Sequence, residues 1–323
     1  MNIVLCYPVE DRHLAQIQAA MPDATIINAG QERVNEELPN ADIFCGHAKV
    51  PVDWQRVVDG GRLRWIQSSA AGMDHCLVSC VIESEIVVSS ASGLFADQVA
   101  EQTMALLLGS IRSMDVFYNA KLSREFIRRP TGDLQGKTVG IVGFGGNGRR
   151  IAEVIAPFKT RILATDLFPH DKPDHVEALW AADDLGRLLG SSDIVILCVP
   201  LNEQTHGMIN ASTLDQFKQD SILFNVARGP VVVESDLVAS LSSGKLSAAA
   251  LDVTEVEPLP ETSPLWEMPN VIITPHVGAQ SARRVDVSTA FFCENLQRYQ
   301  QSLPPLNLVE KRLGFPLPEH RKA

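Results

Sequence analysis

The sequence lacks the features that mark several other classes of protein. It has no basic run, and its formal net charge of −11 reflects 28 Lys and Arg residues against 39 Asp and Glu. Nucleic acid and anionic membranes are therefore poor partners, and an anionic substrate would need a local cation. No apolar run reaches membrane-spanning length, and no charged-then-apolar leader opens the chain. We therefore expect a cytoplasmic location.

Cysteine is scarce and has no recognisable metal-ligand spacing. The six cysteines mostly lie in apolar contexts, which are typical of buried, reduced thiols. His75, Cys76 and Cys80 lie close together, but no fourth ligand at a recognisable spacing accompanies them, so we expect no metal site. No internal repeat or low-complexity segment is present either. The 323 residues are enough for two domains with ample core.

The first hundred residues alternate between apolar strand patterns and helical patterns. Strands are expected at 3–7, 25–27, 43–45, 63–67 and 86–89, with helices at 14–21 and 54–58. This alternation predicts a parallel sheet covered on both faces. The small residues at 68–74 follow the fourth expected strand, where open α/β sheets bind ligands. Their backbone N–H groups could hold a carboxylate, and a simple strand–helix turn is the alternative.

A glycine-dense corner after the apolar segment 138–142 is the clearest motif of the chain. Gly143, Gly145 and Gly148 have G-x-G-x-x-G spacing, a helical pattern follows, and the next apolar segment ends on Asp166. Such glycines permit a tight turn, approach of a pyrophosphate to the backbone, and close packing of helix on strand. The helix start offers free N–H groups and a positive dipole end to phosphates. The motif predicts a dinucleotide site, with an ordinary glycine turn as the alternative.

Asp166 also indicates which dinucleotide binds. Its carboxylate can accept a hydrogen bond from a ribose 2′-OH and would repel a 2′-phosphate, and residues 167–170 include no arginine. NAD is therefore favoured over NADP. Arg149 and Arg150 open the following helix, where they either attract phosphate or are solvated surface side chains.

Repeated strand–helix units around the glycine corner predict a second doubly wound sheet. The expected strands after the corner are 161–165, 193–199, 222–226, 248–253 and 271–274. A long helical pattern over 95–117 leads into this sheet, and a final helix over about 282–300 returns the chain to the first domain. The tail from Pro304 is expected either to cover a surface or to be mobile.

Four side chains suited to chemistry follow strands of the second sheet: Arg228, Asp252, Glu257 and His276. Because the carboxyl ends of parallel strands lie on one edge, we expect these residues to converge near a bound nicotinamide. Arginine can bind a carboxylate and polarise a keto oxygen. Histidine can protonate that oxygen as hydride arrives, and a carboxylate can orient the ring. Each residue alone could be a surface ion-pair partner or turn residue, but together they match hydride transfer to a 2-keto acid.

Seven segments in order make the sequence resemble the D-isomer-specific 2-hydroxyacid dehydrogenases over nearly its whole length. They are 71–74, 99–101, 143–148, 199–205, 225–229, 252–260 and 274–278. The resemblance implies an NAD-dependent oxidoreductase acting on small 2-keto or D-2-hydroxy acids, of glyoxylate or hydroxypyruvate type. It also implies a Rossmann NAD domain at 101–289, inserted into a flavodoxin-like substrate domain at 1–100 and 290–323. A homodimer formed largely through the NAD domain follows from the same resemblance.

The resemblance also implies roles for individual residues. Arg228, Glu257 and His276 would be the catalytic trio, and the backbone of Ala71 and Gly72 would bind the substrate carboxylate, with Arg228 and His276 also touching substrate. Cofactor contacts are implied at Gly143, Gly145, Gly146, Asn147, Gly148, Asp166, Val199, Pro200, Val226, Ala227, Arg228, Asp252, His276 and Gly278. Two positions depart from the family pattern: Asn147 replaces an aliphatic residue, and Glu234 stands where Asp is commoner.

Three other functions are compatible with parts of this pattern. Formate oxidation occurs in the same family but should have Gln where this chain has Glu257. An NAD-responsive binding protein, similar to the related transcriptional corepressors, would retain the trio, but the chain has no long interaction tail or basic segment. A methyltransferase with the same glycine loop would have no use for Arg228, Glu257 and His276.

Overall fold

The computed structural model describes residues 1–321 and divides the chain into two compact units. Unit 1 comprises Met1–Phe95 and Ser281–Ala323, and unit 2 comprises Ala96–Gln280. Unit 2 is thus an insertion within unit 1. Its ends lie within ten residues of the boundaries expected at 100 and 290.

Unit 1 contains a five-stranded, wholly parallel sheet in the order β2-β1-β3-β4-β5. The strands are β1 (Asn2–Cys6), β2 (Thr25–Asn28), β3 (Ile43–Gly46), β4 (Trp65–Ser68) and β5 (Val87–Ser89). Every residue of β3 and β4 is buried, as the central strands of a sheet covered on both faces must be. This is the flavodoxin-like order that the resemblance implied.

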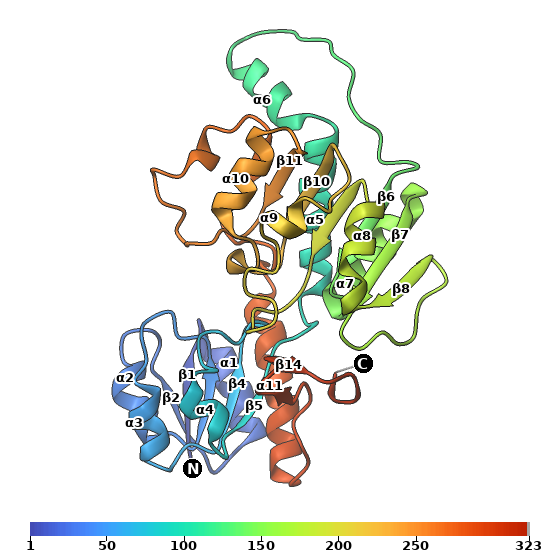
Figure 1. Ribbon diagram of the computed structural model, residues 1–323. Coiled ribbons are helices and arrows are strands. Elements are labelled where there is room, and N and C mark those ends of the chain that lie inside the picture. The colour runs from blue at the N-terminus through green and yellow to red at the C-terminus, as the bar shows by residue number, and fades with distance from the viewer. Residues whose placement is uncertain (322–323) are drawn as a thin grey trace. The chain divides into compact units, whose positions relative to one another are not determined.

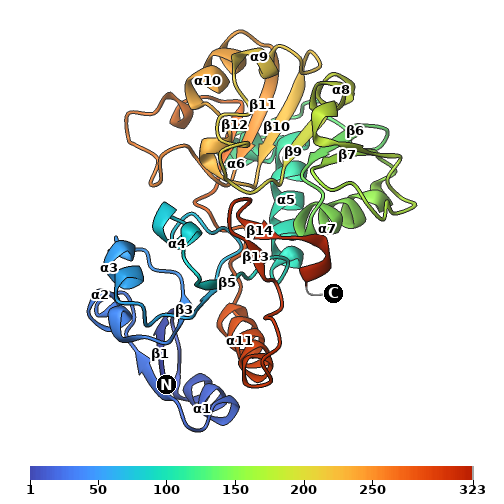
Figure 2. The same ribbon diagram turned by 60° about the horizontal axis from the view of Figure 1, so that its bottom comes forward.

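Helices cover both faces of the unit 1 sheet (Figure 2). One face packs on α1 (Asp11–Ala20) and α11 (Arg284–Gln300), with Ile17, Phe292 and Leu296 fully buried against the strands. The other face packs on α2 (Val34–Glu37), α3 (Trp54–Asp59) and α4 (Ser79–Glu83). The two segments of the chain therefore share one hydrophobic core.

Unit 2 contains a seven-stranded parallel sheet in the order β12-β11-β10-β9-β6-β7-β8. The strands are β6 (Thr138–Val142), β7 (Arg161–Asp166), β8 (Ala178–Ala181), β9 (Ile194–Leu197), β10 (Ser221–Asn225), β11 (Leu246–Leu251) and β12 (Val271–Ile273). The chain reverses its direction across the sheet between β6 and β9. This reversal is the point at which doubly wound sheets bind ligands at their strand ends.

The seven-stranded sheet is also a middle layer (Figure 1). The helices α5 (Ala96–Ile111) and α7 (Gly146–Ile155) pack on one face. The other face carries α8 (Leu185–Ser191), α9 (Ala211–Leu214) and α10 (Glu234–Ser242). The Rossmann-type architecture expected for this part of the chain is confirmed.

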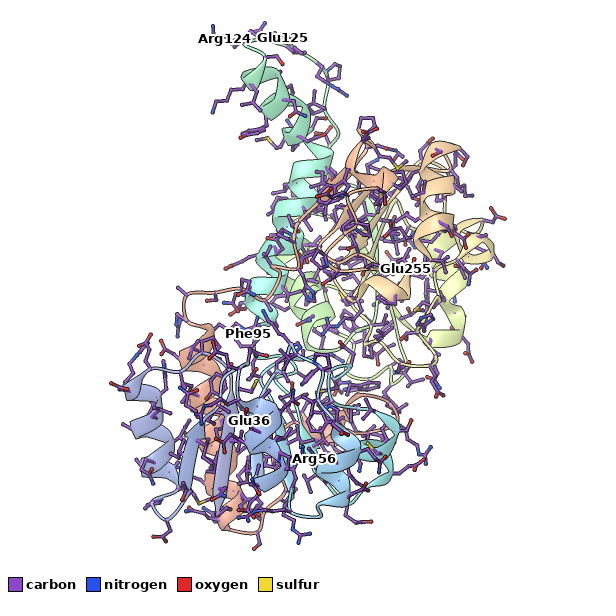
Figure 3. The ribbon with its side chains drawn as sticks, turned by 90° about the vertical axis from the view of Figure 1, so that its left-hand side faces the viewer. Glu36, Arg56, Phe95, Arg124, Glu125 and Glu255 are labelled. Carbon is purple, nitrogen blue, oxygen red and sulfur yellow. The ribbon has the colours of Figure 1, made fainter. Side chains whose placement is uncertain are left out.

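The single helix expected over 95–117 is instead two helices. The first, α5, ends at Ile111, and α6 (Met114–Leu122) follows. Ser113 between them has a left-handed backbone with φ of 53°, which the regular helix excludes. Beyond α6 the chain is irregular. Figure 3 shows that α6 projects from the rest of unit 2, with Arg124 and Glu125 at the outer end of the projecting segment. The apolar content of the segment did not reveal the break.

The C-terminal tail forms regular contacts within unit 1. Strands β13 (Val309–Glu310) and β14 (Phe315–Pro316) pair antiparallel, and Leu308 bridges to Ser89 of β5. Asn307 is buried and donates from Nδ2 to the carbonyl of Ser90 at 3.2 Å. Of the two alternatives for the tail, covering a surface is therefore correct, and the surface is the edge beside β5.

Within residues 1–321, no helix is both long and apolar enough to span a membrane. All six cysteines are free thiols, of which Cys6, Cys45 and Cys76 are buried. Burial raises the pKa of Cys6 to about 11 and that of Cys198 to about 12. The described part of the chain brings no group of three or more His, Cys, Asp or Glu side chains into a metal-binding arrangement.

Candidate active site

The glycine corner lies at the C-terminal end of β6, at the reversal of strand order. Gly143 has φ of +91°, a left-handed conformation that favours glycine. Helix α7 begins at Gly146, and its N-cap residue, Gly145, has no side chain to cap it. The first N–H groups of α7 are therefore available to an anion at this end of the helix.

The other two glycines of the motif, Gly145 and Gly148, differ in how much space surrounds them. A Cβ on Gly148 would lie 2.2 Å from the carbonyl oxygen of Gly143, so α7 packs too closely on the turn for any side chain. A Cβ on Gly145 would meet no atom within 4 Å. The corner thus has open space beside Gly145 and uncapped N–H groups beyond it, which fits the pyrophosphate of a dinucleotide.

Asp166 ends β7 beside this corner. Its Oδ2 accepts a hydrogen bond from the N–H of Phe144 at 2.6 Å, and its Oδ1 accepts one from the N–H of Phe168 at 2.8 Å. These backbone bonds fix the carboxylate at the strand end. A carboxylate accepts about four hydrogen bonds, so Asp166 can still accept one from a ribose hydroxyl.

The two arginines at the start of α7 are both engaged within unit 2. Arg149 donates to the carbonyls of His170 and Asp171 at 2.6 and 2.8 Å. Arg150 pairs with Asp97 at 2.6 Å and with Glu153 at 2.7 Å. These contacts give both side chains a local structural role.

The remaining unit 2 candidates follow four other strands of the same sheet, β9 to β12. Val199 and Pro200 follow β9, Arg228 follows β10, Asp252 follows β11 and His276 follows β12. Because all seven strands are parallel, these residues lie on the same edge as the glycine corner, as expected. Asn147 lies at the second position of α7, and nothing in the structure explains its departure from an aliphatic residue.

The Arg228 turn is built by the residues that precede it. Asn225 accepts a hydrogen bond from the N–H of Ala227 at 3.1 Å and donates to the carbonyl of Arg228 at 3.0 Å. A Cβ on Gly229 would lie 1.7 Å from the carbonyl oxygen of Thr254. The turn after β10 therefore lies directly against the segment after β11, which leads to Glu257.

His276 and Glu257 form a hydrogen-bonded pair. Nδ1 of His276 lies 2.8 Å from Oε2 of Glu257, and the two side chains are 45% and 38% exposed. The bond to Nδ1 fixes the ring orientation and leaves Nε2 for another partner. His276 also has φ of 53°, in the left-handed region that non-glycine residues rarely adopt. This backbone conformation sets the direction in which the imidazole ring projects.

The electrostatic surroundings keep Glu257 ionised. Burial raises its pKa, but the hydrogen bond and charge of His276, the N–H of Thr254 and the charge of Arg228 together outweigh burial. The pKa of Glu257 is therefore held below its usual value. An ionised Glu257 is a hydrogen-bond acceptor for Nδ1 of His276, which leaves Nε2 as the ring nitrogen that can exchange a proton with a substrate.

Asp252 organises the loop that carries His276, which we call the histidine loop (residues 274–278). It is 3% exposed, and its carboxylate accepts hydrogen bonds from Thr274 Oγ1 at 2.6 Å, Val277 N at 3.0 Å and Gly278 N at 2.8 Å. Its main-chain carbonyl accepts from the N–H of His276 at 2.7 Å. Asp252 thus holds the loop at four points.

Sequence reasoning missed two residues that support this arrangement. Gln102 of α5 donates to Thr274 Oγ1 at 3.0 Å, and that hydroxyl in turn donates to Asp252. Thr254 donates its N–H to Glu257 Oε1 at 3.2 Å. Thr254 stands in the same short segment as Glu257, which was the available signal, whereas no local pattern marks Gln102.

In unit 1, the predicted substrate-binding residues follow β4 in a segment that we call the carboxylate loop (residues 69–72). Ser68, the last residue of β4, accepts a hydrogen bond from the N–H of Ala70 at 3.0 Å. The loop then reaches Ala71, which is exposed, and Gly72, which is half-buried. The N–H groups of Ala71 and Gly72 donate to no carbonyl within the described chain. This backbone can therefore bind an anion.

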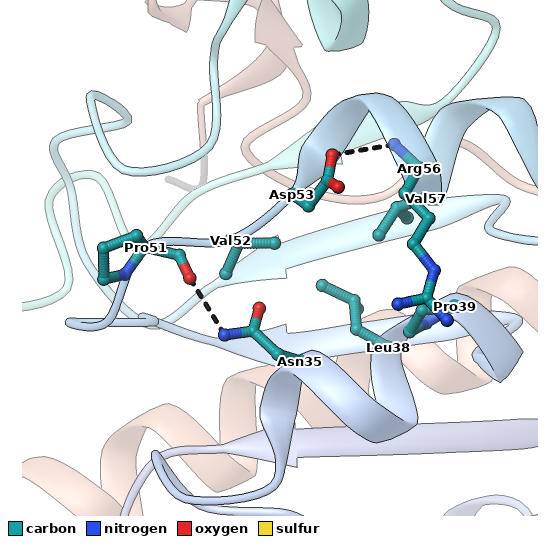
Figure 4. A pocket seen from close by; sticks show the side chains of 8 residues that line it. All are labelled: Asn35, Leu38, Pro39, Pro51, Val52, Asp53, Arg56 and Val57. Carbon is teal, nitrogen blue, oxygen red and sulfur yellow. Dashed lines mark hydrogen bonds between the residues drawn. The ribbon is translucent and has the colours of Figure 1, made fainter.

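One hollow of unit 1 lies away from the carboxylate loop. It has a volume of about 370 Å³ and is lined by Asn35, Leu38, Pro39, Pro51, Val52, Asp53, Arg56 and Val57 (Figure 4). Asn35 donates to the carbonyl of Pro51 at 2.9 Å, and Asp53 caps α3 by accepting from the N–H of Arg56 at 3.1 Å. These polar groups serve local structure, and no predicted site residue lines the hollow.

Comparison with known proteins agrees with this geometry. Residues 104–278 match the NAD-binding domain of the D-isomer specific 2-hydroxyacid dehydrogenases. The chain is 33% identical to a glyoxylate reductase of Aeropyrum pernix over 81% of each protein. It is also 33% identical to glyoxylate/hydroxypyruvate reductase A of Klebsiella pneumoniae, over 98% of this chain and all of that one.

A solved structure supports the same assignment. The D-isomer specific 2-hydroxyacid dehydrogenase of Xanthobacter autotrophicus, crystallised with NADPH and MES, superposes with a TM-score of 0.82 at 27% identity. The superposition covers 97% of this chain and 99% of that one. With the fold, the glycine corner and the Glu257–His276 pair in place, the chain belongs to the D-isomer-specific 2-hydroxyacid dehydrogenase family.

Proposed function

We propose that this protein reduces a small 2-keto acid to the corresponding D-2-hydroxy acid with NADH, and catalyses the reverse oxidation. The observation that carries the proposal is the 2.8 Å bond between Glu257 and His276, on the sheet edge that also carries the glycine corner and Arg228. This set combines a proton donor, a cation for a carboxylate or keto oxygen, and a dinucleotide site.

The roles follow from the atoms available. Bound NADH would supply a hydride to the carbonyl carbon of the substrate. His276, held through Nδ1, presents Nε2 to donate the proton that the carbonyl oxygen takes up, and accepts it in the reverse direction. Arg228 binds the carboxylate and polarises the carbonyl. Glu257 orients the ring and stabilises the imidazolium, a positioning role like that of the buried acid in hydrolase triads.

Ala71 and Gly72 bind the substrate carboxylate in this proposal. Their N–H groups are available in the carboxylate loop, and backbone N–H groups of this kind stabilise anions without adding charge. The chain carries a net charge of −11, so such local donors and Arg228 must offset a repulsive background.

We propose the following cofactor contacts. The pyrophosphate lies against the backbone of Gly143, Gly145, Gly146, Asn147 and Gly148, supported by the open space at Gly145. The ribose lies at Asp166, and the adenosine part near Val199 and Pro200. The nicotinamide end would contact Val226, Ala227, Arg228, Asp252, His276 and Gly278, with Asp252 reaching the carboxamide.

NAD is the proposed cofactor, although the Xanthobacter relative was crystallised with NADPH. The fixed carboxylate of Asp166 would repel a 2′-phosphate, and Arg149 is occupied by backbone carbonyls. We expect kcat/KM to be higher with NADH than with NADPH, and Asp166→Ser to narrow the difference. A wild-type preference for NADPH would overturn this assignment.

A substrate panel tests the proposed reaction. Purified protein with NADH would be mixed with glyoxylate, hydroxypyruvate, pyruvate, phenylpyruvate and 2-ketoisocaproate, and absorbance at the NADH band followed. We expect turnover with the smaller acids, because the chain is similar to a glyoxylate reductase of Aeropyrum pernix and to glyoxylate/hydroxypyruvate reductase A of Klebsiella pneumoniae. No absorbance loss with any acid would favour an NAD-responsive binding protein instead.

We also propose a homodimer. Met114, Tyr118 and Leu122 recur every four residues along one face of α6 and are 56%, 60% and 65% exposed, and Phe126 beyond them is 94% exposed. An exposed apolar stripe of this kind marks an interaction surface, and a second copy of the chain is the occupant that the family resemblance implies. Light scattering should give twice the chain mass, and Tyr118→Ser with Phe126→Ser should give the monomer; a monomeric wild type would refute the proposal.

A further inference from the structure

Glu257 lies on an exposed segment of unit 2, which we call the glutamate loop (residues 255–263). The loop lies between β11 and the short 3-10 helix η5 (Pro264–Trp266). All of its residues except Leu259 and Ser263 are exposed. Burial therefore does little to hold this loop in place, and polar contacts at its ends must do so.

One residue outside the loop bonds to both of its ends. Glu234, the first residue of α10, donates its main-chain N–H to Oε2 of Glu255 at 2.8 Å. Its own Oε1 accepts a hydrogen bond from Oγ of Ser263 at 2.9 Å. Because Glu255 is the first residue of the loop and Ser263 is the last, these two bonds close the loop against α10.

The bond at Glu255 also serves the helix. The N-cap residue of α10, Val233, has no side chain that can accept from the first N–H groups of the helix. The carboxylate of Glu255 accepts from the first of them, and its charge is favourable at the positive end of the helix dipole. Leu237 and Leu241 bury α10 against the sheet. The loop is therefore fastened to a packed element.

The length of the Glu234 side chain decides the bond to Ser263. An aspartate is one methylene shorter, which withdraws the carboxylate by about 1.5 Å. A contact of 2.9 Å that is lengthened by this amount is no longer a hydrogen bond. Aspartate is the commoner residue here in the family pattern, so the second bond depends on the glutamate that this chain has instead.

We propose that Glu234 is a positioning residue for proton transfer: by closing the glutamate loop at both ends, it holds Glu257 at hydrogen-bond distance from His276. This inference rests on the proposed function. Glu257 lies 2.8 Å from Nδ1 of His276 and accepts from the N–H of Thr254 at 3.2 Å. Both contacts require the loop backbone to stay in place, and the orientation of the His276 ring depends on the first of them.

The test begins with Glu234→Asp, which keeps the charge and the main-chain N–H but shortens the side chain. We expect kcat for glyoxylate to fall about 3- to 10-fold through the loss of one hydrogen bond, while NADH affinity and the KM for glyoxylate stay within about twofold. Glu234→Gln keeps the length and an acceptor oxygen and should recover most of kcat. Ser263→Ala should match Glu234→Asp, and the two changes together should cost no more than either alone.

Ser235→Ala is the matched control, because Ser235 is the exposed neighbour of Glu234 on the same helix. It should leave kcat unchanged. A thermal melt of each variant would confirm that it is folded at the temperature of the assay. A fall in kcat as large in Ser235→Ala as in Glu234→Asp would overturn the inference, because it would assign the effect to α10 in general.

A cycle with Glu257 separates positioning from a merely structural role. In a Glu257→Ala background no carboxylate is left to position, so Glu234→Asp should then change kcat by less than about twofold. An undiminished loss in that background would overturn the inference. Wild-type turnover of glyoxylate combined with an unchanged kcat in Glu234→Asp would refute the inference alone, whereas no turnover of any 2-keto acid by the wild type would refute the proposed function and the inference with it.

Discussion

Gly145 and Gly148 stand three residues apart in one motif, yet their replacement by alanine should affect different properties of the protein. A Cβ on Gly148 would lie 2.2 Å from the carbonyl oxygen of Gly143 and 3.2 Å from Cγ2 of Ile141. A Cβ on Gly145 would meet nothing within 4 Å, and its φ of −75° suits alanine. Gly148→Ala should therefore damage the fold, and Gly145→Ala should damage only cofactor binding.

The magnitudes follow from the contacts. Overpacking costs about 1 to 3 kcal/mol, and a clash with backbone has no rotamer to relieve it, so Gly148→Ala belongs at about 3 kcal/mol. For a unit of this size that loss lowers the Tm by about 6 to 12 °C. Gly145→Ala would obstruct one hydrogen bond between backbone and phosphate, worth about 1.5 to 3 kcal/mol. NADH affinity should then fall about 10- to 150-fold.

The assay is a thermal melt and an NADH fluorescence titration on both variants and the wild type. The expected result is a normal Tm with weakened NADH binding for Gly145→Ala, and a lowered Tm for Gly148→Ala. Wild-type NADH affinity in Gly145→Ala would refute the placement of the pyrophosphate. A wild-type Tm in Gly148→Ala would refute the packing argument.

Three further predictions concern charged side chains. Glu257→Gln removes a partly exposed, charge-assisted bond worth about 1 to 2 kcal/mol, so kcat should fall about 5- to 30-fold while NADH still binds; an unchanged kcat would remove Glu257 from the orienting role. Asp252→Ala leaves three donors of the histidine loop without their acceptor, and a denaturant titration should show a loss of about 3 to 5 kcal/mol. Burial raises the pKa of Asp193, but Lys218 and the N–H of Thr138 outweigh it and the pKa is lowered. Its stabilisation is therefore fully present above the unfolded pKa of about 3.9 and is lost as pH falls through the lower pKa of the folded state, so the Tm gap between wild type and Asp193→Asn should narrow progressively as pH falls below about 4; a gap that widens as pH falls from 5 to 3 would contradict this.

Parallel-sheet logic made most of unit 2 predictable from its sequence. Arg228, Asp252 and His276 each follow a buried apolar run, and parallel strands all end on one edge. That rule placed the three residues together without any knowledge of side-chain contacts. It could not show that Asp252 is already bonded to the histidine loop through three donors, because those contacts depend on a left-handed backbone at His276 that composition does not reveal.

The features that were missed depend on single residues or on distant packing. Strand β8 is a four-residue edge strand with one neighbour, too short for a clear alternation. The break after α5 depends on φ at Ser113 alone. The stacking of His75 on His47 was missed because the two residues lie 28 positions apart in the sequence and only the sheet brings the two rings together.

The insertion of unit 2 within unit 1 has a consequence for synthesis on the ribosome. The core of unit 1 needs Phe292 and Leu296 from α11 packed beside Ile3 and Leu5 of β1. Between these segments the ribosome must make all of residues 96–280, which takes about 10 to 40 s at ordinary elongation rates. The nascent chain therefore carries a fully made NAD-binding unit while its first sheet still exposes an apolar face, and during this interval the chain is most vulnerable to aggregation and most in need of a chaperone.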